Sequence, residues 1–450
     1  MLARDQAKAF CERVLSRADG DEIEVIVGAS ESNALRMAES APSEQNASTR
    51  VRCSIRVVRD GRHGRAEVES LGDAAIDRTI AAARAAAAAT PVSSLPPFAG
   101  ASTGDDGGQP EDAVRAVAGH APAAKVAQVR GYLDRVRASG AVATGFYETK
   151  GESVTYANTA GCFRHAFQGR SWFSSTVLAD DGAGVAHAGA TGENLAPDRI
   201  DAAGQRALDK ALSSRAPRNI DPGDYRVLLE PIAVAELVMF VSWTGMSGRR
   251  LLDGASFLSG KIGERVLSEQ LTIRDDAGDA RFRSPRFDLE GQDRRAVTIV
   301  DAGIGKGVVW DRATALEGQT ETTGHAMPQP CASGPEPDNV IMEAANGVES
   351  DMLARLGNGL LVTQFHYTNV IDPVPVTVTG MTRNGTFLVE NGEIVGPVKN
   401  MRFTQSIIAA LTNVDAVGDD SSLVDVFFGG TCLVPSLLLP AFRFTSATEF

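Results

Sequence analysis

The sequence predicts an α+β fold in two parts: an N-terminal domain with an α/β layer, followed by a mainly antiparallel, barrel-like C-terminal domain. Three observations predict it. Segments with helical and strand periodicity alternate through the first 214 residues. Residues 215–223 then hold Pro217, Pro222 and Gly223, a composition typical of a domain junction. Beyond about residue 265, short runs between turn residues dominate. We therefore expect domains at 1–214 and 222–450.

In the N-terminal part, the apolar residues between Ala7 and Leu15 recur at helical spacing, and a strand follows at residues 22–27. Residues 51–57 alternate apolar with polar, which directs Cys53 into the core, and Asp60 begins a hairpin turn. Pro, Gly, Ser and Asp crowd residues 91–111, which predicts a flexible loop. The same periodicities predict helices at 73–90, 124–138 and 199–213 and strands at 142–148, 153–158, 162–178 and 66–68.

The C-terminal part begins with a strand at 225–230 and an almost wholly apolar helix, with Pro231 in its first turn and residues 232–241 beyond it. Asn384-Gly385 and Asn391-Gly392 each favour a tight hairpin turn, because both central residues of such a turn take positive φ. We expect these turns to bracket a strand at residues 386–390.

Composition limits the classes of function. The chain has 450 residues, 43% of them hydrophobic, and a net charge of −13, which disfavours binding to nucleic acid. No apolar run approaches the roughly 18 residues of a membrane helix, and the first residues turn polar at once, unlike a signal peptide. We expect a cytoplasmic protein with neither membrane nor nucleic-acid partners. We attach no functional weight to its many arginines.

Catalytic motifs are weak. No pair of histidines lies one helical turn apart beside a glutamate, the arrangement of many zinc hydrolases. His325, Cys331, His366 and Cys432 have ligand chemistry but no diagnostic spacing, so four unrelated residues are the simpler interpretation. Cys432 follows a glycine-rich turn that suits a nucleophile, yet its apolar flank favours a buried strand. We expect solvated faces for the acidic residues Glu264, Glu269, Asp275, Asp276, Asp288, Glu290 and Asp293.

Several ordered blocks resemble one family. They are the hairpin from Val51, the stretch Gly254-Ala-Ser-Phe-Leu-Ser-Gly-Lys-Ile-Gly-Glu264 with Leu271–Asp276 and Phe287–Gly291, and Thr379–Ile394 with its Glu-Asn-Gly-Glu turn. Together they are similar to the TldD/PmbA family of peptidase-associated proteins, and to its TldE (PmbA) branch. In that family, the TldD branch carries an HExxxH helix and a later cysteine that hold the catalytic metal. The TldE branch lacks these ligands and pairs with TldD.

The resemblance places the start of the metal helix at Val227–Glu236, where this chain has Glu230 and Pro231 for the first two motif positions and Ala235 for the last. It therefore implies a non-catalytic subunit without a metal or catalytic residue of its own. Zinc would belong to a TldD-like partner, and the substrate would be a peptide or a small amide, as in natural-product maturation. A homodimer of the isolated chain is also considered.

The segment around residues 364–373 departs from the family pattern and suggests a divergent subgroup. His366, Tyr367, Asn369, Asp372 and Arg383 gather polar groups around one expected hairpin, and we name them as candidate substrate-chamber residues. Mutual pairing at a sheet edge is an equally good interpretation. Two other functions stay open: a stand-alone hydrolase that uses Cys432 or His366, and a homo-oligomeric binding or scaffold protein.

Overall fold

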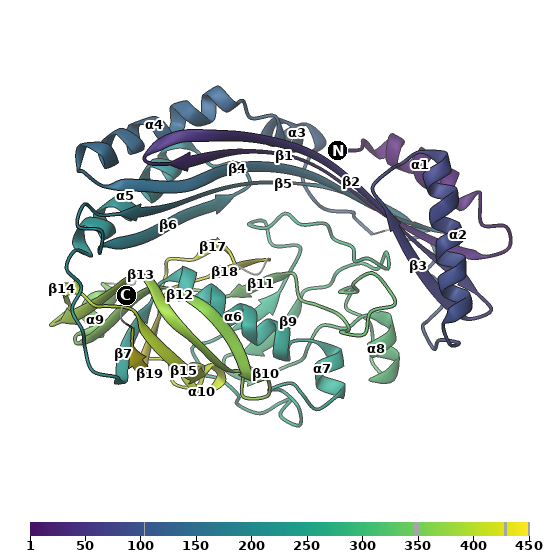
Figure 1. The fold of residues 1–450 in the computed structure, drawn as a ribbon. Coiled ribbons are helices and arrows are strands. Elements are labelled where there is room, and N and C mark those ends of the chain that lie inside the picture. Colours follow the sequence, from purple (N-terminus) through teal and green to yellow (C-terminus); the bar gives the residue numbers. More distant parts are fainter. Residues whose placement is uncertain (103, 346–350, 427–429, 449–450) are drawn as a thin grey trace.

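The structure is a computed structural model that describes residues 1–450 except 103, 346–350, 427–429 and 449–450. The α+β prediction is confirmed. The elements up to residue 213 form an N-terminal part and those from residue 223 a C-terminal part, which we call the N-terminal and C-terminal domains. A sheet of long strands arches over the second domain (Figure 1), so that one face of the sheet carries helices and the other faces the second domain. Among the described residues, no helix has the length and apolar character needed to cross a membrane.

The N-terminal sheet is antiparallel throughout, in the order β3-β2-β1-β4-β5-β6. The segments expected at 142–148 and 153–158 form one strand, because Gly151 between them pairs with Glu31 on one side and Gly169 on the other. A sixth strand, β6, was not predicted. The strands are β1 (Glu22–Ala38), β2 (Ala41–Arg59), β3 (Arg62–Val68), β4 (Val142–Asn158), β5 (Phe163–Leu178) and β6 (Val185–Gly192).

Helices cover the outer face of this sheet. Successive side chains of β1 point to opposite faces of the sheet, which explains why helices cover only one face. Val25 and Leu35 point to the helices, whereas Ile26 points to the second domain. Cys53 is buried on the helix side, as predicted. Gly204 lets two helices approach closely, because a Cβ there would lie 2.6 Å from the ring of Tyr132. The helices are α1 (Arg4–Leu15), α2 (Asp73–Ala89), α3 (Glu111–Ala118), α4 (Pro122–Ala138) and α5 (Pro197–Ser213).

The segment 91–111 bridges the two domains. Gly108 donates its N–H to the carbonyl of Ser284 at 3.0 Å, and Arg286 donates to the carbonyl of Asp106 at 2.9 Å. The flexibility expected for this segment stays a prediction, but the described part of it holds the domains together.

The predicted barrel-like sheet of the C-terminal domain is confirmed, and in the structure it closes into a barrel. Strands run in the order β12-β7-β19-β15-β13, and a further pairing of β12 with β13 closes the ring. The rings of Phe365, Phe403 and Phe442 fill it, with centroids 4.7–5.4 Å apart. The barrel strands are β7 (Gly223–Leu229), β12 (Gly359–Asp372), β13 (Thr377–Glu390), β15 (Met401–Ser406) and β19 (Leu437–Ala447), with β14 (Glu393–Pro397) and β16 (Ala416–Val417) attached.

A second sheet in the order β10-β9-β8-β11-β18-β17 faces the barrel across α6 (Pro231–Gly245). Because α6 contacts β12 on one side and β18 on the other, it is apolar nearly all round. The strands are β8 (Ile273–Asp275), β9 (Val297–Asp301), β10 (Ile304–Gly305), β11 (Asn339–Met342), β17 (Ser422–Asp425) and β18 (Thr431–Val434). The short helices are α7 (Gly248–Leu252), α8 (Arg312–Glu317), α9 (Met352–Leu356) and α10 (Ile407–Thr412).

Two local predictions need correction. Asn391-Gly392 does turn the chain from β13 into β14, but Asn384-Gly385 lies inside β13. There the register shifts by one residue against β12, so the positive φ angles of 56° and 124° serve a bulge rather than a hairpin turn.

The acidic run is not uniformly solvated either. Asp275, Asp288 and Glu290 are at most 2% exposed. Asp288 accepts hydrogen bonds from three backbone N–H groups, so this carboxylate organises the surrounding loop.

Candidate functional site

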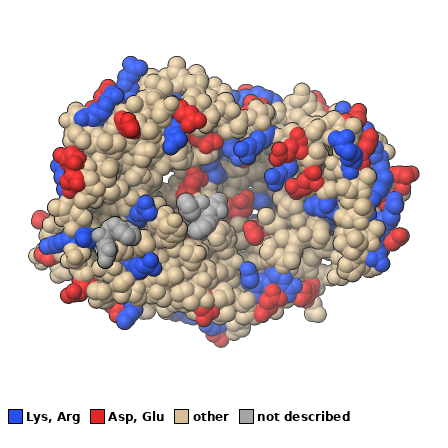
Figure 2. All heavy atoms as spheres, viewed as in Figure 1, with Lys and Arg blue, Asp and Glu red and all other residues tan. Residues whose placement is uncertain are grey.

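A large cavity lies between the two domains, with a volume of about 1020 Å³. Its N-terminal wall comes from β4, β5, β6 and α5, and its C-terminal wall comes from the start of α6, from β17 and β18, and from adjoining loops. Figure 2 shows the surface hollowed between the arched sheet and the second domain. The fold therefore places a large cavity between the N-terminal and C-terminal parts of the chain, lined by side chains of both.

The N-terminal wall follows from strand alternation. Phe146 pairs across the sheet with Ser174, and Lys150 pairs with Arg170, and all four line the cavity. Tyr147, next to Phe146 in the strand, points the other way and packs beneath the helices. One face of the same strands thus builds the core, while the other face is free to carry polar and aromatic groups.

Helix α5 adds a basic stripe. Arg199, Ala202, Arg206 and Lys210 are spaced three or four residues apart, lie on one side of the helix and line the cavity. Lys210 Nζ donates to Glu230 Oε1 at 2.5 Å and to Thr363 Oγ1 at 3.3 Å. By contrast, Arg199 and Arg206 have no ion-pair or side-chain hydrogen-bond partner within the described part of the chain.

The charges on the two walls are segregated by domain. Each Lys or Arg among the described lining residues belongs to the N-terminal domain, and only Glu152 is an acid of that wall. The C-terminal wall contributes the carboxylates of Glu230, Glu236, Asp338, Asp420 and Asp425. Burial raises the pKa of Glu236 above its ordinary value. A ligand in the cavity therefore meets opposite charge at its two sides.

Polar contacts join the two walls. Arg170 Nη1 lies 3.3 Å from Asp425 Oδ1, and Thr191 Oγ1 donates to Asp425 Oδ2 at 3.0 Å. At the rim, Arg283 Nε lies 3.1 Å from Glu193 Oε1. Together with the Lys210–Glu230 pair, these contacts fix the position of one domain relative to the other.

The start of α6 is where the family resemblance would place a metal site, so its residues show whether this chain can bind a metal there. Glu230 is the residue before the helix, its carboxylate is engaged by Lys210, and both Glu230 and Pro231 line the cavity. Ala235 is fully buried, and its methyl side chain has no atom that could bind a metal. Nowhere in the described ranges do three or more His, Cys, Asp or Glu side chains gather in a metal-binding arrangement. The residues at this position do not fit a zinc ion.

The four residues weighed as metal ligands are separate. His325 is buried, with Nε2 2.8 Å from Asp275 Oδ1 and Nδ1 2.9 Å from Thr323 Oγ1, so both ring nitrogens are occupied. Cys331 lies on a loop with Sγ 3.1 Å from Ser333 Oγ. Cys432 is buried on β18, where burial raises the pKa of its thiol to about 12. His366 lies on β12 in the barrel.

The five candidate chamber residues lie on β12 and β13, which pair as an antiparallel hairpin. His366 packs edge-to-face against Tyr367 with ring centroids 4.4 Å apart, and burial together with the charge of Arg383 lowers the pKa of His366. Tyr367 is 71% exposed, and Asn369 and Asp372 are exposed too. Of this hairpin, only Gln364 is among the described residues that line the cavity. A role for the five in binding stays a prediction.

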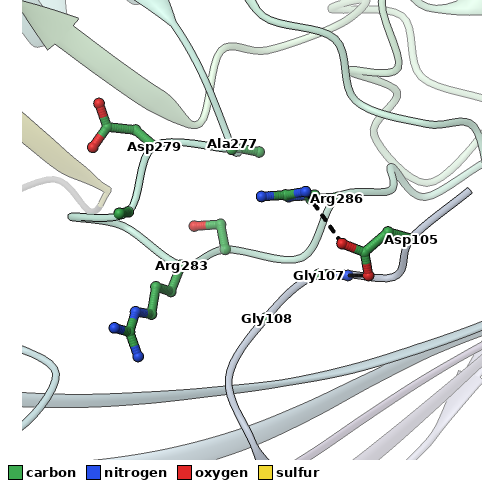
Figure 3. A pocket seen from close by; sticks show the side chains of 10 residues that line it. Asp105, Gly107, Gly108, Ala277, Asp279, Arg283 and Arg286 are labelled. Atoms are coloured by element: carbon green, nitrogen blue, oxygen red, sulfur yellow. Dashed lines mark hydrogen bonds and ion pairs between the residues drawn. The ribbon is translucent and has the colours of Figure 1, made fainter.

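A smaller pocket of about 370 Å³ lies where residues 105–108 meet residues 277–286 (Figure 3). The acidic residues that line it are paired with arginines. Asp105 pairs with Arg286 at 3.1 Å, and Asp279 accepts hydrogen bonds from Arg281 and Arg274. These hydrogen bonds hold the pKa of Asp279 well below its usual range. The larger cavity, with two unpaired arginines, is the stronger candidate for a ligand.

Comparison with known proteins identifies the family. The chain matches the PmbA/TldA metallopeptidase C-terminal domain over residues 222–446 and domain 1 over residues 23–87. It therefore belongs to the PmbA/TldD family of metallopeptidases, a peptidase-associated family. The N-terminal cavity wall, at residues 146–210, falls between the two matched ranges.

Curated relatives carry metalloprotease names. A metalloprotease of Methanothermobacter thermautotrophicus is 25% identical over 287 residues, which is 62% of each chain. A metalloprotease PmbA homolog of Haemophilus influenzae is 28% identical over 221 residues, 48% of this chain and 46% of that one. The chain thus spans about three fifths of the first relative and under half of the second.

Solved structures share the fold. TldE from Thermococcus kodakarensis has a TM-score of 0.87 at 20% identity, covering 97% of this chain and 100% of that one. A putative modulator of a DNA gyrase from Thermotoga maritima has a TM-score of 0.84 at 19% identity, with the same coverage.

Sequence reasoning did not find the basic stripe. Helix 199–213 was expected, and the spacing of Arg199, Arg206 and Lys210 on it was available as a signal. Because no functional weight was attached to the arginines, their spacing on this helix was overlooked. The acidic wall had no local signal, because its residues come together only through the fold.

Proposed function

We propose that this chain is the substrate-holding subunit of a two-chain metallopeptidase, in which a TldD-like partner supplies the zinc. The chain binds a peptide or small amide in the interdomain cavity and presents it to the partner. Family membership supports the peptidase role, and the size and mixed charge of the cavity suit a peptide better than a purely apolar ligand.

The start of α6 is the observation that carries the proposal. Resemblance places the metal motif of the TldD branch at this point, on the cavity wall. Here a glutamate stands in place of the first histidine, and Lys210 satisfies its carboxylate. A fixed ammonium at that position repels a divalent cation and leaves no imidazole to bind it. The chain thus keeps the chamber while its donor set is unsuited to metal chemistry.

A stand-alone hydrolase finds less support. The Cys432 thiol is buried and, with its pKa raised to about 12, stays protonated at neutral pH, whereas a nucleophile needs the thiolate. His366 lies on β12 of the barrel and is not among the described residues that line the cavity.

The test combines the purified chain with a TldD-like protein from the same genome. We expect no stoichiometric zinc and no peptidase activity from the chain alone, and activity from the mixture. Ser422→Trp adds an indole to the acidic wall and should abolish the activity of the mixture, while Ser48→Trp, on the exposed part of β2, should not. Zinc bound to the chain alone, or activity without the partner, would refute the proposal.

A further inference from the structure

Two arginines in the cavity stand out after the charges on its walls are paired. Lys150 pairs with Glu152, Arg170 with Asp425 and Lys210 with Glu230. Arg199 and Arg206 stay unneutralised among the described residues, in a chain whose net charge is −13. Guanidinium groups left without a partner at a cavity wall suit a planar anion, because each offers two parallel N–H donors to a carboxylate.

The geometry of α5 makes the two arginines one site. They lie two turns apart, about 10 Å along the axis, on the same side of the helix. Ala202 lies between them and is exposed, so its small side chain leaves room for a ligand group.

The opposite wall has a complementary feature. Asp420 lines the cavity, and its Oδ1 accepts hydrogen bonds from the N–H and the hydroxyl of Ser436, each at 2.8 Å. These donors are neutral, and within the described residues no Lys or Arg pairs with Asp420. Asp338, by contrast, is paired with Arg294 at 2.6 Å. Glu236, also on this wall, is buried and has a raised pKa, which favours its uncharged form. Asp420 is thus an exposed carboxylate of the C-terminal wall without a cationic partner among the described residues, while Arg199 and Arg206 lie on the N-terminal wall.

We propose that the cavity selects short peptides with a free C-terminal carboxylate, which Arg199 and Arg206 bind, and with a cationic group that faces Asp420. This inference rests on the proposed function and specifies its substrate class. The arginines lie on the wall segment between the two family-matched ranges, in the N-terminal domain.

Helix geometry also limits the length of the peptide. Along α5, Lys210 lies about 6 Å beyond Arg206 and about 16 Å beyond Arg199, and Lys210 contacts Glu230 at the start of α6. An extended peptide rises about 3.3 Å per residue. The C-terminal carboxylate is thus held two to five residues from the position that faces the start of α6.

Calorimetric titration of the full chain tests the proposal with three pentapeptides that share an N-terminal lysine. One has a free C-terminus, one is amidated, and one is amidated with a glutamate near its end. We expect the free acid to bind at least tenfold more tightly than either amide. Arg199→Gln with Arg206→Gln should remove that difference and leave amide binding unchanged. Arg130→Gln, an exposed arginine on α4 outside the described lining, is the matched control.

The outcomes separate this inference from the function on which it rests. Equal binding of free acid and plain amide overturns carboxylate selection, and so does a double variant that keeps the difference. If the glutamate amide binds as tightly as the free acid, the site recognises any carboxylate and selection for the C-terminus is overturned. If no peptide binds but the mixture with the partner cleaves peptides, the inference fails and the proposed function stands. An inactive mixture refutes the proposed function itself.

Discussion

Replacement of Glu290 by glutamine should change how the stability of this protein depends on pH. Glu290 is 2% exposed and lies in the loop that inserts Phe287 and Leu289 against Tyr156 and Cys162 of the arched sheet. Burial, reinforced by the charge of Asp288, raises the pKa of Glu290 to about 8. The carboxyl is thus protonated in the folded protein over a range in which it is ionised in the unfolded chain.

The sign and the size of this effect follow from the linkage between proton binding by Glu290 and folding. Because the folded state binds the proton more tightly, the contribution of this group to stability is complete below its ordinary pKa of 4.5 and is lost as the pH rises through about 8. The pKa of Glu290 rises from 4.5 to about 8 on folding. At 1.36 kcal/mol per pKa unit, this rise corresponds to roughly 5 kcal/mol of folding free energy. Glutamine resembles the protonated carboxyl in shape and does not ionise. Glu290→Gln should therefore match the wild type near pH 4.5 and exceed it in stability by several kcal/mol near pH 8.5.

Urea unfolding at pH 4.5, 6.5 and 8.5 measures this difference. Glu321→Gln is the control, because Glu321 is an exposed carboxyl paired with exposed Arg295. Arg295 lowers the pKa of Glu321, so any effect of its ionisation on stability falls below its ordinary pKa of 4.5, and its replacement should leave the change between pH 6.5 and 8.5 unaltered. Parallel stability profiles for wild type and Glu290→Gln would refute the reasoning, since they would mean that the carboxyl is equally free to ionise in both states.

Three further predictions concern the contacts between the walls and the reactivity of the chain. Lys210→Met should lower the free energy of unfolding by about 1–2 kcal/mol by leaving the half-buried carboxylate of Glu230 unpaired, and a double-mutant cycle with Glu230→Gln should recover part of the loss in urea unfolding. Arg164→Met should cost about 3–5 kcal/mol in the same assay, because this buried guanidinium pairs with two carboxylates, at 2.5 and 2.6 Å. Cys432 should resist alkylation at pH 8 in the folded protein, as followed by mass spectrometry, and react once urea exposes it.

Periodicity predicted most of the fold because it reports which side of an element is buried. The alternation at Cys53 and the apolar run after Pro231 both led to the correct environment. Prediction failed where tertiary pairing overrode a local signal. Residues 149–152 were left outside the two expected strands, yet strands on both sides of β4 keep Gly151 extended. Asn384-Gly385 forms a bulge because β12 continues to pair beyond it.

The candidate site was harder to predict, because its two walls come from segments far apart in the chain. Glu230 was identified through resemblance, and it does line the cavity. Asp420 and Arg206, however, face the same space only after the two domains pack, and no local pattern links them. The buried position of Asp288 was likewise invisible, since its partners are backbone N–H groups of its own loop and of Ala326.

The alternation along β4 and β5 has a consequence for how this protein changes over time. Residues such as Tyr147 pack beneath the helices, whereas Phe146 and Lys150 on the same strand line the cavity. Substitutions at surface-facing positions usually alter stability by no more than about 0.5 kcal/mol. Lining positions that make no contact with the second domain can therefore accumulate mutations one at a time without repacking of the core. Ligand preference can diverge among descendants of this protein while the fold keeps its stability.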